Sequence, residues 1–260
     1  MHERHQNRSK YFQEQVYTTE KYVIPFLQKS IKITAETRVL EIGCGEGGNL
    51  KPFLDIGCKC IGVDLSESKI EKGKAIFLDN PKSDRITLIC EDIYRTENIG
   101  QFDLIILRDV IEHIHDQEKF MGGVGQFLKP DGQIFFGFPP WYNPFGGHQQ
   151  ICQSRILSKT PWFHVFPMAV YKAILRLFGE PEDRVESLAE IKETGITLER
   201  FEGILKRTGF NISLRHLFLF NPNYDIKFGL KPRKQFALFA AIPFFRNWVT
   251  TAGYYLIGKK

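Results

Sequence analysis

Short apolar runs that alternate with helical segments are the feature that most constrains the fold of this chain. These runs are rich in Val, Ile, Leu and Phe, and they lie at 38–42, 58–63, 86–90, 102–107 and 133–138. Such strands pair in parallel, because each intervening helix returns the chain across one face of the sheet in a right-handed crossover. The alternation therefore predicts an α/β fold with a doubly wound, mostly parallel sheet.

Capping residues and prolines mark the expected helix boundaries. Ser66, Asp116 and Thr197 are candidate N-caps of three helices. An amphipathic stretch over 12–30 should break at Pro25, because proline lacks an amide hydrogen. The other expected elements are a helix over 46–56, a turn at "KPDG" (129–132), and strands over 211–220 and 251–260.

The strand–helix rhythm changes after residue 138, where six prolines fall within 139–196. We interpret this stretch as an inserted helical cap that binds the acceptor, with helical pieces at 165–178 and 183–192. The chain is then predicted to have four parts: an N-terminal helical segment (1–35), a cofactor-binding α/β core (36–138), the cap (139–196), and a C-terminal part (197–260) that completes the sheet and carries a basic and aromatic insertion at 221–248.

Composition excludes several classes of function. The net charge of +5 is too small to indicate a nucleic-acid partner. The five cysteines are odd in number and show no paired CxxC motifs, so we expect reduced thiols, no metal site and a cytoplasmic protein. The opening stretch "MHERHQNRSK" is polar and predicts no secretory signal.

Residues 227–246 mix five basic residues with the apolar run "FALFAAIPFF". That run is much shorter than the roughly 20 residues that a membrane-spanning helix requires. One interpretation is a helix that lies on a membrane surface and admits a lipid-like acceptor. The interpretation that we favour is a lid helix packed on the protein's own core.

The stretch "RVLEIGCGEGGNL" places four glycines between a strand and a helical segment. Gly43, Gly45 and Gly48 satisfy the dinucleotide fingerprint G-x-G-x-x-G, which alone is a weak signal. Glu41 and Glu46 flank the loop, and these two carboxylates would repel a pyrophosphate. The charge therefore favours a ligand that is cationic and has no phosphate.

S-adenosylmethionine meets that requirement, because it carries a sulfonium and an ammonium group. Glu41, Asp64 and Asp92 follow three successive strands, so all three should lie at the carboxyl edge of the sheet, where open α/β folds bind ligands. Asp64 stands about 20 residues after the glycines, where an acid accepts hydrogen bonds from ribose hydroxyls.

Five motifs in order, "VLEIGCGEG", "VDLS", "CEDI", "FDLIILRDVIEHI" and "LKPDG", give the chain a specific resemblance. It is similar to the class I S-adenosylmethionine-dependent methyltransferases, in the small-molecule branch that includes quinone-biosynthesis enzymes. The resemblance covers about residues 36–138 and implies a seven-stranded Rossmann-like sheet whose last strand is antiparallel. It further implies methyl transfer to a small molecule, at oxygen, with S-adenosylhomocysteine as the product.

The resemblance also implies roles for the residues around the cofactor. The backbone of Gly43, Cys44 and Gly45 would approach the methionine part, and Glu41 would face its ammonium group. The carbonyl of Leu107 or Arg108 would contact the same ammonium. Arg108 departs from the small residue usual at that strand end, so it could instead pair with the methionine carboxylate or an acidic acceptor.

The adenosine part is assigned in the same way. Asp64 would hold the ribose hydroxyls while Leu65 packs on the adenine. Asp92 would accept from the adenine amine, and the Ile93 amide would donate to a ring nitrogen.

Histidines are the candidate bases. His148, in the glycine-flanked loop "NPFGGHQQ" after the fifth strand, is the first candidate, and His113 is the second. We expect His115 to be structural, and His164 to be either a base or a packed core residue. Two alternative functions remain at this stage: an NAD(P)-dependent oxidoreductase, and a non-catalytic nucleotide-binding module with the same fold.

Overall fold

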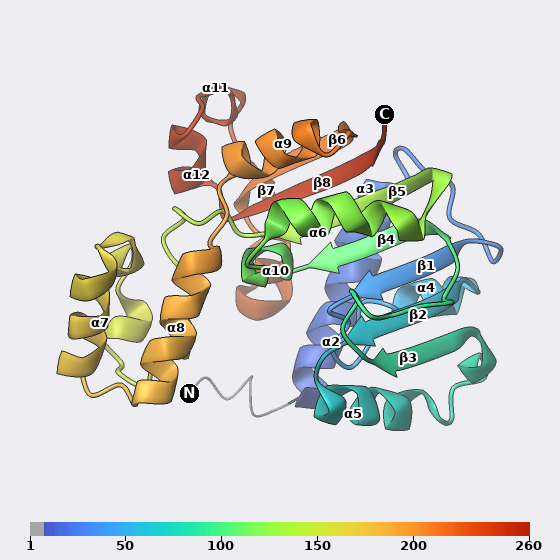
Figure 1. Ribbon diagram of the computed structural model, residues 1–260, viewed down its shortest axis with the longest axis horizontal. Helices are drawn as coiled ribbons and strands as arrows, with labels where there is room; N and C mark the ends of the chain where they lie inside the picture. The colour runs from blue at the N-terminus through green and yellow to red at the C-terminus, as the bar shows by residue number, and fades with distance from the viewer. Residues whose placement is uncertain (1–7) are drawn as a thin grey trace.

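The computed structural model describes residues 8–260 and forms one mixed eight-stranded sheet with helices on both faces (Figure 1). The polar stretch 1–7, part of the predicted N-terminal segment, lies outside the described residues. The strands are β1 (Arg38–Ile42), β2 (Lys59–Asp64), β3 (Ile86–Cys90), β4 (Phe102–Arg108), β5 (Leu128–Phe138), β6 (Phe210–Phe220), β7 (Arg233–Lys234) and β8 (Ala252–Lys259).

The strand order is β3-β2-β1-β4-β5-β8-β6-β7, with β1 to β5 parallel. The strand β8 inserts antiparallel between β5 and β6, as the family resemblance implied for the last strand. The doubly wound fold is confirmed, but the count of seven strands is wrong by one. The extra strand is β7, whose two residues pair with the edge strand β6 and are too few to give a periodic signal.

Two helical layers cover the sheet. One face packs against α2 (Arg8–Thr18), α3 (Ile24–Leu27), α4 (Lys51–Ile56) and α5 (Glu67–Phe77), and the other against α6 (Gln117–Val124) and α9 (Leu198–Arg207). The remaining helices are α7 (Met168–Leu177), α8 (Glu182–Thr194), α10 (Asn223–Phe228), α11 (Ala237–Ala241) and α12 (Phe245–Val249).

The expected break near Pro25 takes the form of a π-helical turn, Thr19–Val23, between α2 and α3. Proline cannot donate to the preceding turn of an α-helix, and a wider turn accommodates the missing bond. Thr19 lies in this turn and its hydroxyl donates to Asn49 Oδ1 at 2.9 Å. The N-terminal helices are thereby tied to the loop that follows β1.

Two of the three predicted N-cap side chains form capping hydrogen bonds. Asp116 and Thr197 do cap α6 and α9, since their side chains accept from the amides of Lys119 and Arg200. Ser66 occupies the N-cap position of α5, but its side chain makes no capping bond. The "KPDG" stretch is not a turn between elements. It lies inside β5 as a bulge, because Phe102 pairs with Leu128 while Leu104 pairs with Gln133.

The first helix after the glycine loop begins later than expected. Residues 46–50 form turns, and α4 starts at Lys51 with Pro52 in its first turn. Proline is favoured there because the first amides of a helix lack intrahelical partners. The loop after β1 is consequently longer than the glycine pattern alone suggests.

Residues 139–196 hold α7 and α8 and lie beside the sheet rather than on it (Figure 1). They form a small core of their own, made of Cys152, Leu157, Phe163, Tyr171, Leu175, Val185 and Leu188. The contacts between α8 and the segment after β4 include Gln117 Nε2, which donates to the Thr194 carbonyl oxygen at 2.6 Å. This stretch is therefore attached to the core close to the end of β4.

The segment before β8 is not the packed lid helix that we favoured from sequence. The helix α11 has no buried residue, and of its five residues Ala240, which is half-buried, packs against the large core. The expectation was wrong because Pro243 follows α11 so closely that the apolar run is divided between two short helices, and the first of them has no buried residue. Across residues 8–260, no helix combines the length and apolar character needed to span a bilayer.

Candidate functional site

A cavity of about 430 Å³ opens at the carboxyl ends of β1, β2 and β3. Its lining comprises Ile42, Gly43, Val63, Asp64, Leu65, Ser66, Lys69, Glu91, Asp92, Ile93, Tyr94, Val110, Ile114 and Phe120. Five of these residues are cofactor contacts predicted from sequence: Gly43, Asp64, Leu65, Asp92 and Ile93. The structure brings these five together from three separate strand ends, as expected for ligands of open α/β sheets.

The glycine loop is shaped by backbone conformation and by close approach. Gly43, Gly45 and Gly47 have φ of +73°, +56° and +83°, which L-residues rarely adopt. A Cβ on Gly43 would lie 2.6 Å from Val110 Cγ2. Gly48 is needed for a different reason, since a Cβ there would lie 2.9 Å from the carbonyl oxygen of Phe12 in α2.

Asp64 organises the loop from the end of β2. One of its carboxylate oxygens accepts from the Gly45 amide and the other from the Ser66 amide, both at 2.8 Å. The two bonds fix the carboxylate between the glycine loop and the start of α5. Each oxygen retains a second lone pair that could accept from a ligand hydroxyl.

Apolar and aromatic side chains form the far side of the cavity. Leu65 stands at the rim and is exposed, while Tyr94 and Phe120 meet edge to face with ring centroids 6.3 Å apart. Asp92 accepts from the Tyr94 amide at 3.0 Å, which turns the chain after β3 so that Ile93 lines the cavity. This half of the cavity suits a flat aromatic group with polar edges.

Glu41 lies fully buried behind the loop, outside the set of residues that line the cavity. One of its carboxylate oxygens accepts from Asn49 Nδ2 at 2.6 Å, and Asn49 Oδ1 in turn accepts from Arg108 at 2.7 Å. Burial raises the pKa of Glu41 to about 8, against the opposing effects of the Asn49 bond and the Arg108 charge. The sequence missed Asn49, although it lies within the quoted glycine stretch.

Arg108 and two other predicted contacts lie away from the cavity wall. The Arg108 guanidinium bonds to Thr19, Asn49 and Asn223, so it joins β4 to the N-terminal helices and to α10. Leu107 is buried in the large core. The Cys44 side chain is buried too, and a Cβ on Gly62 would lie 2.7 Å from its sulfur, so only its backbone could meet a ligand.

Lys69 is a cation at the site that was not predicted from sequence. It lies on α5, lines the cavity, and its side-chain Cδ would be 3.8 Å from a Cβ on Gly45. The second acid of the loop, Glu46, is buried and pairs with Arg8 at 3.1 Å. One cation therefore faces the cavity beside Gly45, while the Glu46 charge is directed toward α2.

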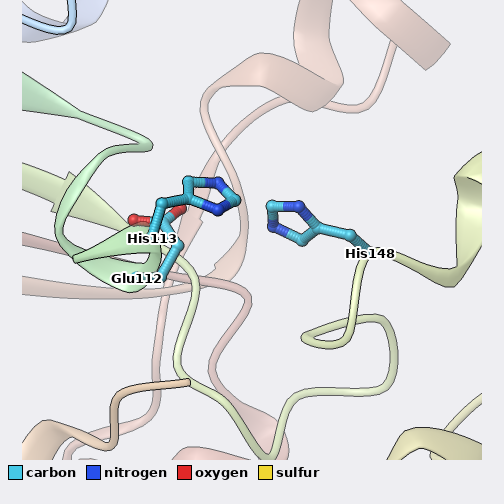
Figure 2. A group of neighbouring side chains, drawn as sticks. All are labelled: Glu112, His113 and His148. Atoms are coloured by element: carbon cyan, nitrogen blue, oxygen red, sulfur yellow. The ribbon is translucent and has the colours of Figure 1, made fainter. Parts of the chain in front are cut away.

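The two histidines proposed as bases lie against each other (Figure 2). His113 lies in a 3-10 turn after β4, and His148 lies in the loop after β5 with φ of +55°. Their ring centroids are 5.0 Å apart and the ring planes are inclined by 68°. Burial lowers the pKa of His113, which keeps this imidazole neutral and able to accept a proton.

Glu112 lies beside this pair, and sequence reasoning gave it no firm role. It is buried, and neither carboxylate oxygen meets a hydrogen-bond donor from another residue. Burial and the negative charge of Asp109 raise its pKa well above the usual range. A carboxylate oxygen of Glu112 and a ring nitrogen of each histidine lie within 4.8 Å of one another, so among residues 8–260 this trio could also hold a divalent cation.

His115 and His164, the two other histidines considered from sequence, have structural contacts. His115 is exposed and its Nε2 lies 3.0 Å from Glu190 Oε1 on α8. His164 is fully buried, and its ring nitrogens face the Trp141 carbonyl oxygen at 2.8 Å and Gln149 Nε2 at 3.3 Å. Burial lowers the pKa of His164 to about 4, in keeping with a packed neutral ring.

Comparison with known proteins agrees with this architecture. A family model described as "Methyltransferase domain" matches residues 12–164. Two curated relatives are named ubiquinone biosynthesis O-methyltransferase. The one from Thiobacillus denitrificans is 28% identical over 39% of this chain and 44% of its own length. The one from Bradyrhizobium is 34% identical over 40% of this chain and 40% of its own length. This chain thus spans less than half the length of the curated relatives that it matches.

A solved structure matches nearly the whole chain. Magnesium protoporphyrin IX methyltransferase from Synechocystis, crystallised with bound S-adenosylhomocysteine, superposes with a TM-score of 0.56 and 14% identity. The match covers 95% of this chain and 84% of that one. At this identity the likeness is one of fold.

Proposed function

Since the chain belongs to the methyltransferase domain family, we propose that it transfers a methyl group from S-adenosylmethionine to a small-molecule acceptor, at oxygen. The names of the two curated relatives support the choice of oxygen. The family membership speaks against the alternative of a dinucleotide oxidoreductase.

The observation that carries the proposal is the composition of the 430 Å³ cavity. Asp64 and Asp92, from neighbouring strand ends, lie on a wall that also holds Leu65, Ile93 and Tyr94. Acids that accept from ribose hydroxyls and from an amine, next to apolar groups that pack on a ring, fit an adenosine. We assign Asp64 to the ribose and Asp92 with Ile93 to the adenine edge.

The methionine end of the cofactor would lie along the glycine loop. Gly43 and Gly45 leave room for it to approach the backbone, and Lys69 is placed to pair with a carboxylate there. Glu41 would act through Asn49 and Arg108, by holding the loop in position. We therefore treat Glu41 and Arg108 as positioning residues for the ammonium end.

When bound, S-adenosylmethionine supplies an electrophilic methyl group on a sulfonium that leaves as a neutral thioether, so no acid is needed at the leaving group. The protein's task is to align the acceptor and exclude water. A hydroxyl acceptor must also lose its proton, and we assign that step to His148 with His113 as its neighbour. We assign the buried Glu112 a positioning role beside the two imidazole rings.

We assign acceptor binding to residues 139–196, with the core at 36–138 as the cofactor-binding part and 197–260 completing the sheet. In this stretch Tyr142 stacks on Trp248 with ring centroids 5.0 Å apart, and the Trp162 ring lies 6.5 Å from the same Trp248 ring. Aromatic groups at this position favour a planar or apolar acceptor.

The five free thiols support a cytoplasmic setting, which is part of the same proposal.

Isothermal titration with S-adenosylmethionine, S-adenosylhomocysteine and NADH tests the cofactor. The proposal requires binding of the two sulfur nucleosides and none of NADH, and the reverse pattern would overturn it. A cell extract supplied with a radiolabelled methyl donor then tests the transfer. Label in a small extractable compound is expected, whereas label only in protein would contradict the choice of acceptor, and no label anywhere would favour the non-catalytic module.

A further inference from the structure

Residues 231–248 expose large apolar side chains next to basic ones. Leu238 and Phe244 are each 70% exposed, far more than a side chain packed on its own core. Other large exposed side chains in the segment are Phe236, Phe239, Ile242, Phe245 and Trp248. Single exposed hydrophobic residues are ordinary on a protein surface, but seven within this short segment indicate an interaction site.

Three of the exposed rings contact one another. Phe239 lies edge-on to both Phe236 and Phe245, with ring centroids 6.0 and 5.8 Å apart. The Arg233 guanidinium lies 4.8 Å from the Phe236 ring centroid, so the basic end of the segment touches the aromatic end. The helices α11 and α12 that carry these rings stand at an outer corner of the molecule (Figure 1).

The charged residues within this segment of the chain are all basic. Residues 226–260 contain seven basic residues and no aspartate or glutamate. Lys231, Arg233 and Lys234 are exposed just before the aromatic cluster. Arg246 adds no charge to the exposed surface, because it is buried and pairs with Glu199 and Glu202.

We propose that residues 231–248 dock this protein on the surface of an anionic lipid bilayer. Projecting Leu and Phe side chains enter the boundary between headgroups and acyl chains, while neighbouring lysines and arginine bind lipid phosphates. Residues 231–248 contain no aspartate or glutamate, which matches the negative charge of such a surface. A protein partner would not require this uniform charge.

The docking surface is connected to the acceptor side of the molecule. Trp248 stacks on Tyr142 and lies 6.5 Å from the ring of Trp162, both within 139–196. Trp162 also donates its backbone amide to the Pro144 carbonyl oxygen, in the loop that leads to His148. Docking through 231–248 would therefore bring that loop close to the lipid surface. The docking itself does not depend on the proposed methyl transfer.

Vesicle flotation tests the proposal with two compositions, phosphatidylcholine alone and phosphatidylcholine with about 30 mol% phosphatidylglycerol, whose anionic headgroups give the bilayer a negative surface potential. The protein is expected to float with the anionic vesicles and to release as salt rises, because the charge component is screened. The double variant Leu238→Ser with Phe244→Ser should weaken binding at least about tenfold, since each side chain loses its apolar contact. Lys231→Gln with Lys234→Gln should weaken it about tenfold and reduce the salt dependence.

Matched controls separate docking from general surface effects. Leu78→Ser removes an equally exposed side chain, 75% exposed, at the end of α5 on the opposite side of the molecule. Lys59→Gln with Lys72→Gln removes two exposed charges elsewhere. The proposal is overturned if the wild-type protein binds neither vesicle, or if the controls lose as much binding as the docking variants. It is also overturned if light scattering shows an oligomer that the Leu238 and Phe244 variants dissociate, because the surface would then join copies of the chain.

Discussion

The imidazole rings of His113 and His148 lie with centroids 5.0 Å apart, although the whole of β5 separates them in the chain. The first belongs to the turn after β4 and the second to the loop after β5. Neighbouring parallel strands end at the same edge of a sheet, so their following loops meet there. The sheet topology thus brings together two imidazoles from separate loops.

Replacing either histidine is expected to impair catalysis and spare cofactor binding. Loss of a general base should lower kcat about 100-fold or more for His148→Asn, and His113→Asn should follow in the same direction. Asparagine is chosen because it tolerates the positive φ at position 148. Steady-state kinetics with calorimetric Kd values for S-adenosylmethionine provide the measurement.

The exposed His115 supplies the control for this pair. His115→Asn removes an imidazole paired with Glu190 on the surface, and kcat should not change. A different result would count against the base role: activity of the wild-type enzyme abolished by EDTA and restored by a divalent cation. The Glu112, His113 and His148 trio would then act as metal ligands.

Asp64→Asn is expected to weaken S-adenosylmethionine binding about 10- to 100-fold, because a charged acceptor of hydrogen bonds is lost at the ribose. The amide nitrogen also cannot accept from both Gly45 and Ser66, as the carboxylate does. Asp131→Asn, at the exposed bulge in β5, is the matched control and should bind normally. If calorimetry gives Asp64→Asn and wild type the same affinity for S-adenosylmethionine, Asp64 does not contact the cofactor.

Replacing glycine by alanine should change the stability of the fold in opposite directions at two positions. Gly43→Ala places a methyl group 2.6 Å from Val110 Cγ2 at a positive φ, so both stability and cofactor affinity should fall. Gly122 lies inside α6 with no atom within 4 Å of the added methyl, so Gly122→Ala should raise the free energy of unfolding by up to about 1 kcal/mol. Urea denaturation measures both. Partial rescue of Gly43→Ala by Val110→Ala would identify the clash as the cause.

The buried His164 predicts a loss of stability in acid. Its pKa is about 4 in the folded protein against 6.5 in the unfolded chain, so the unfolded state binds the extra proton first as the pH falls. The contribution of His164 to the free energy of unfolding is fully present above about pH 6.5 and is lost as the pH falls to about 4. The loss amounts to about 3 kcal/mol. Urea denaturation across this range should show it.

His216 contributes in the same direction, because burial also lowers its pKa to about 4. The contribution of His164 is therefore measured as the difference between wild type and His164→Gln in how the free energy of unfolding depends on pH. The substitution should flatten the curve below pH 6.5. An unaltered curve for His164→Gln would refute the assignment.

The elements that the sequence predicted well are those with local causes. The parallel strands follow from runs of apolar residues, and the caps at Asp116 and Thr197 require only the side chain and the next turn of helix. The meeting of Gly43, Asp64 and Asp92 at one cavity also follows from the sequence, because parallel strands place their carboxyl ends at one edge.

Contacts between distant segments were decided by the tertiary structure. The bonds from Arg108 to Thr19, Asn49 and Asn223, and the burial of Glu112 beside two histidines, depend on how loops and helices are placed around the sheet. Periodicity reports which face of an element is apolar, but it does not report which other element covers that face. For the same reason the exposure of α11 was visible only in the folded chain. The sequence by itself determined a cofactor edge on a doubly wound sheet, and packing decided which side chains face it and which face outward.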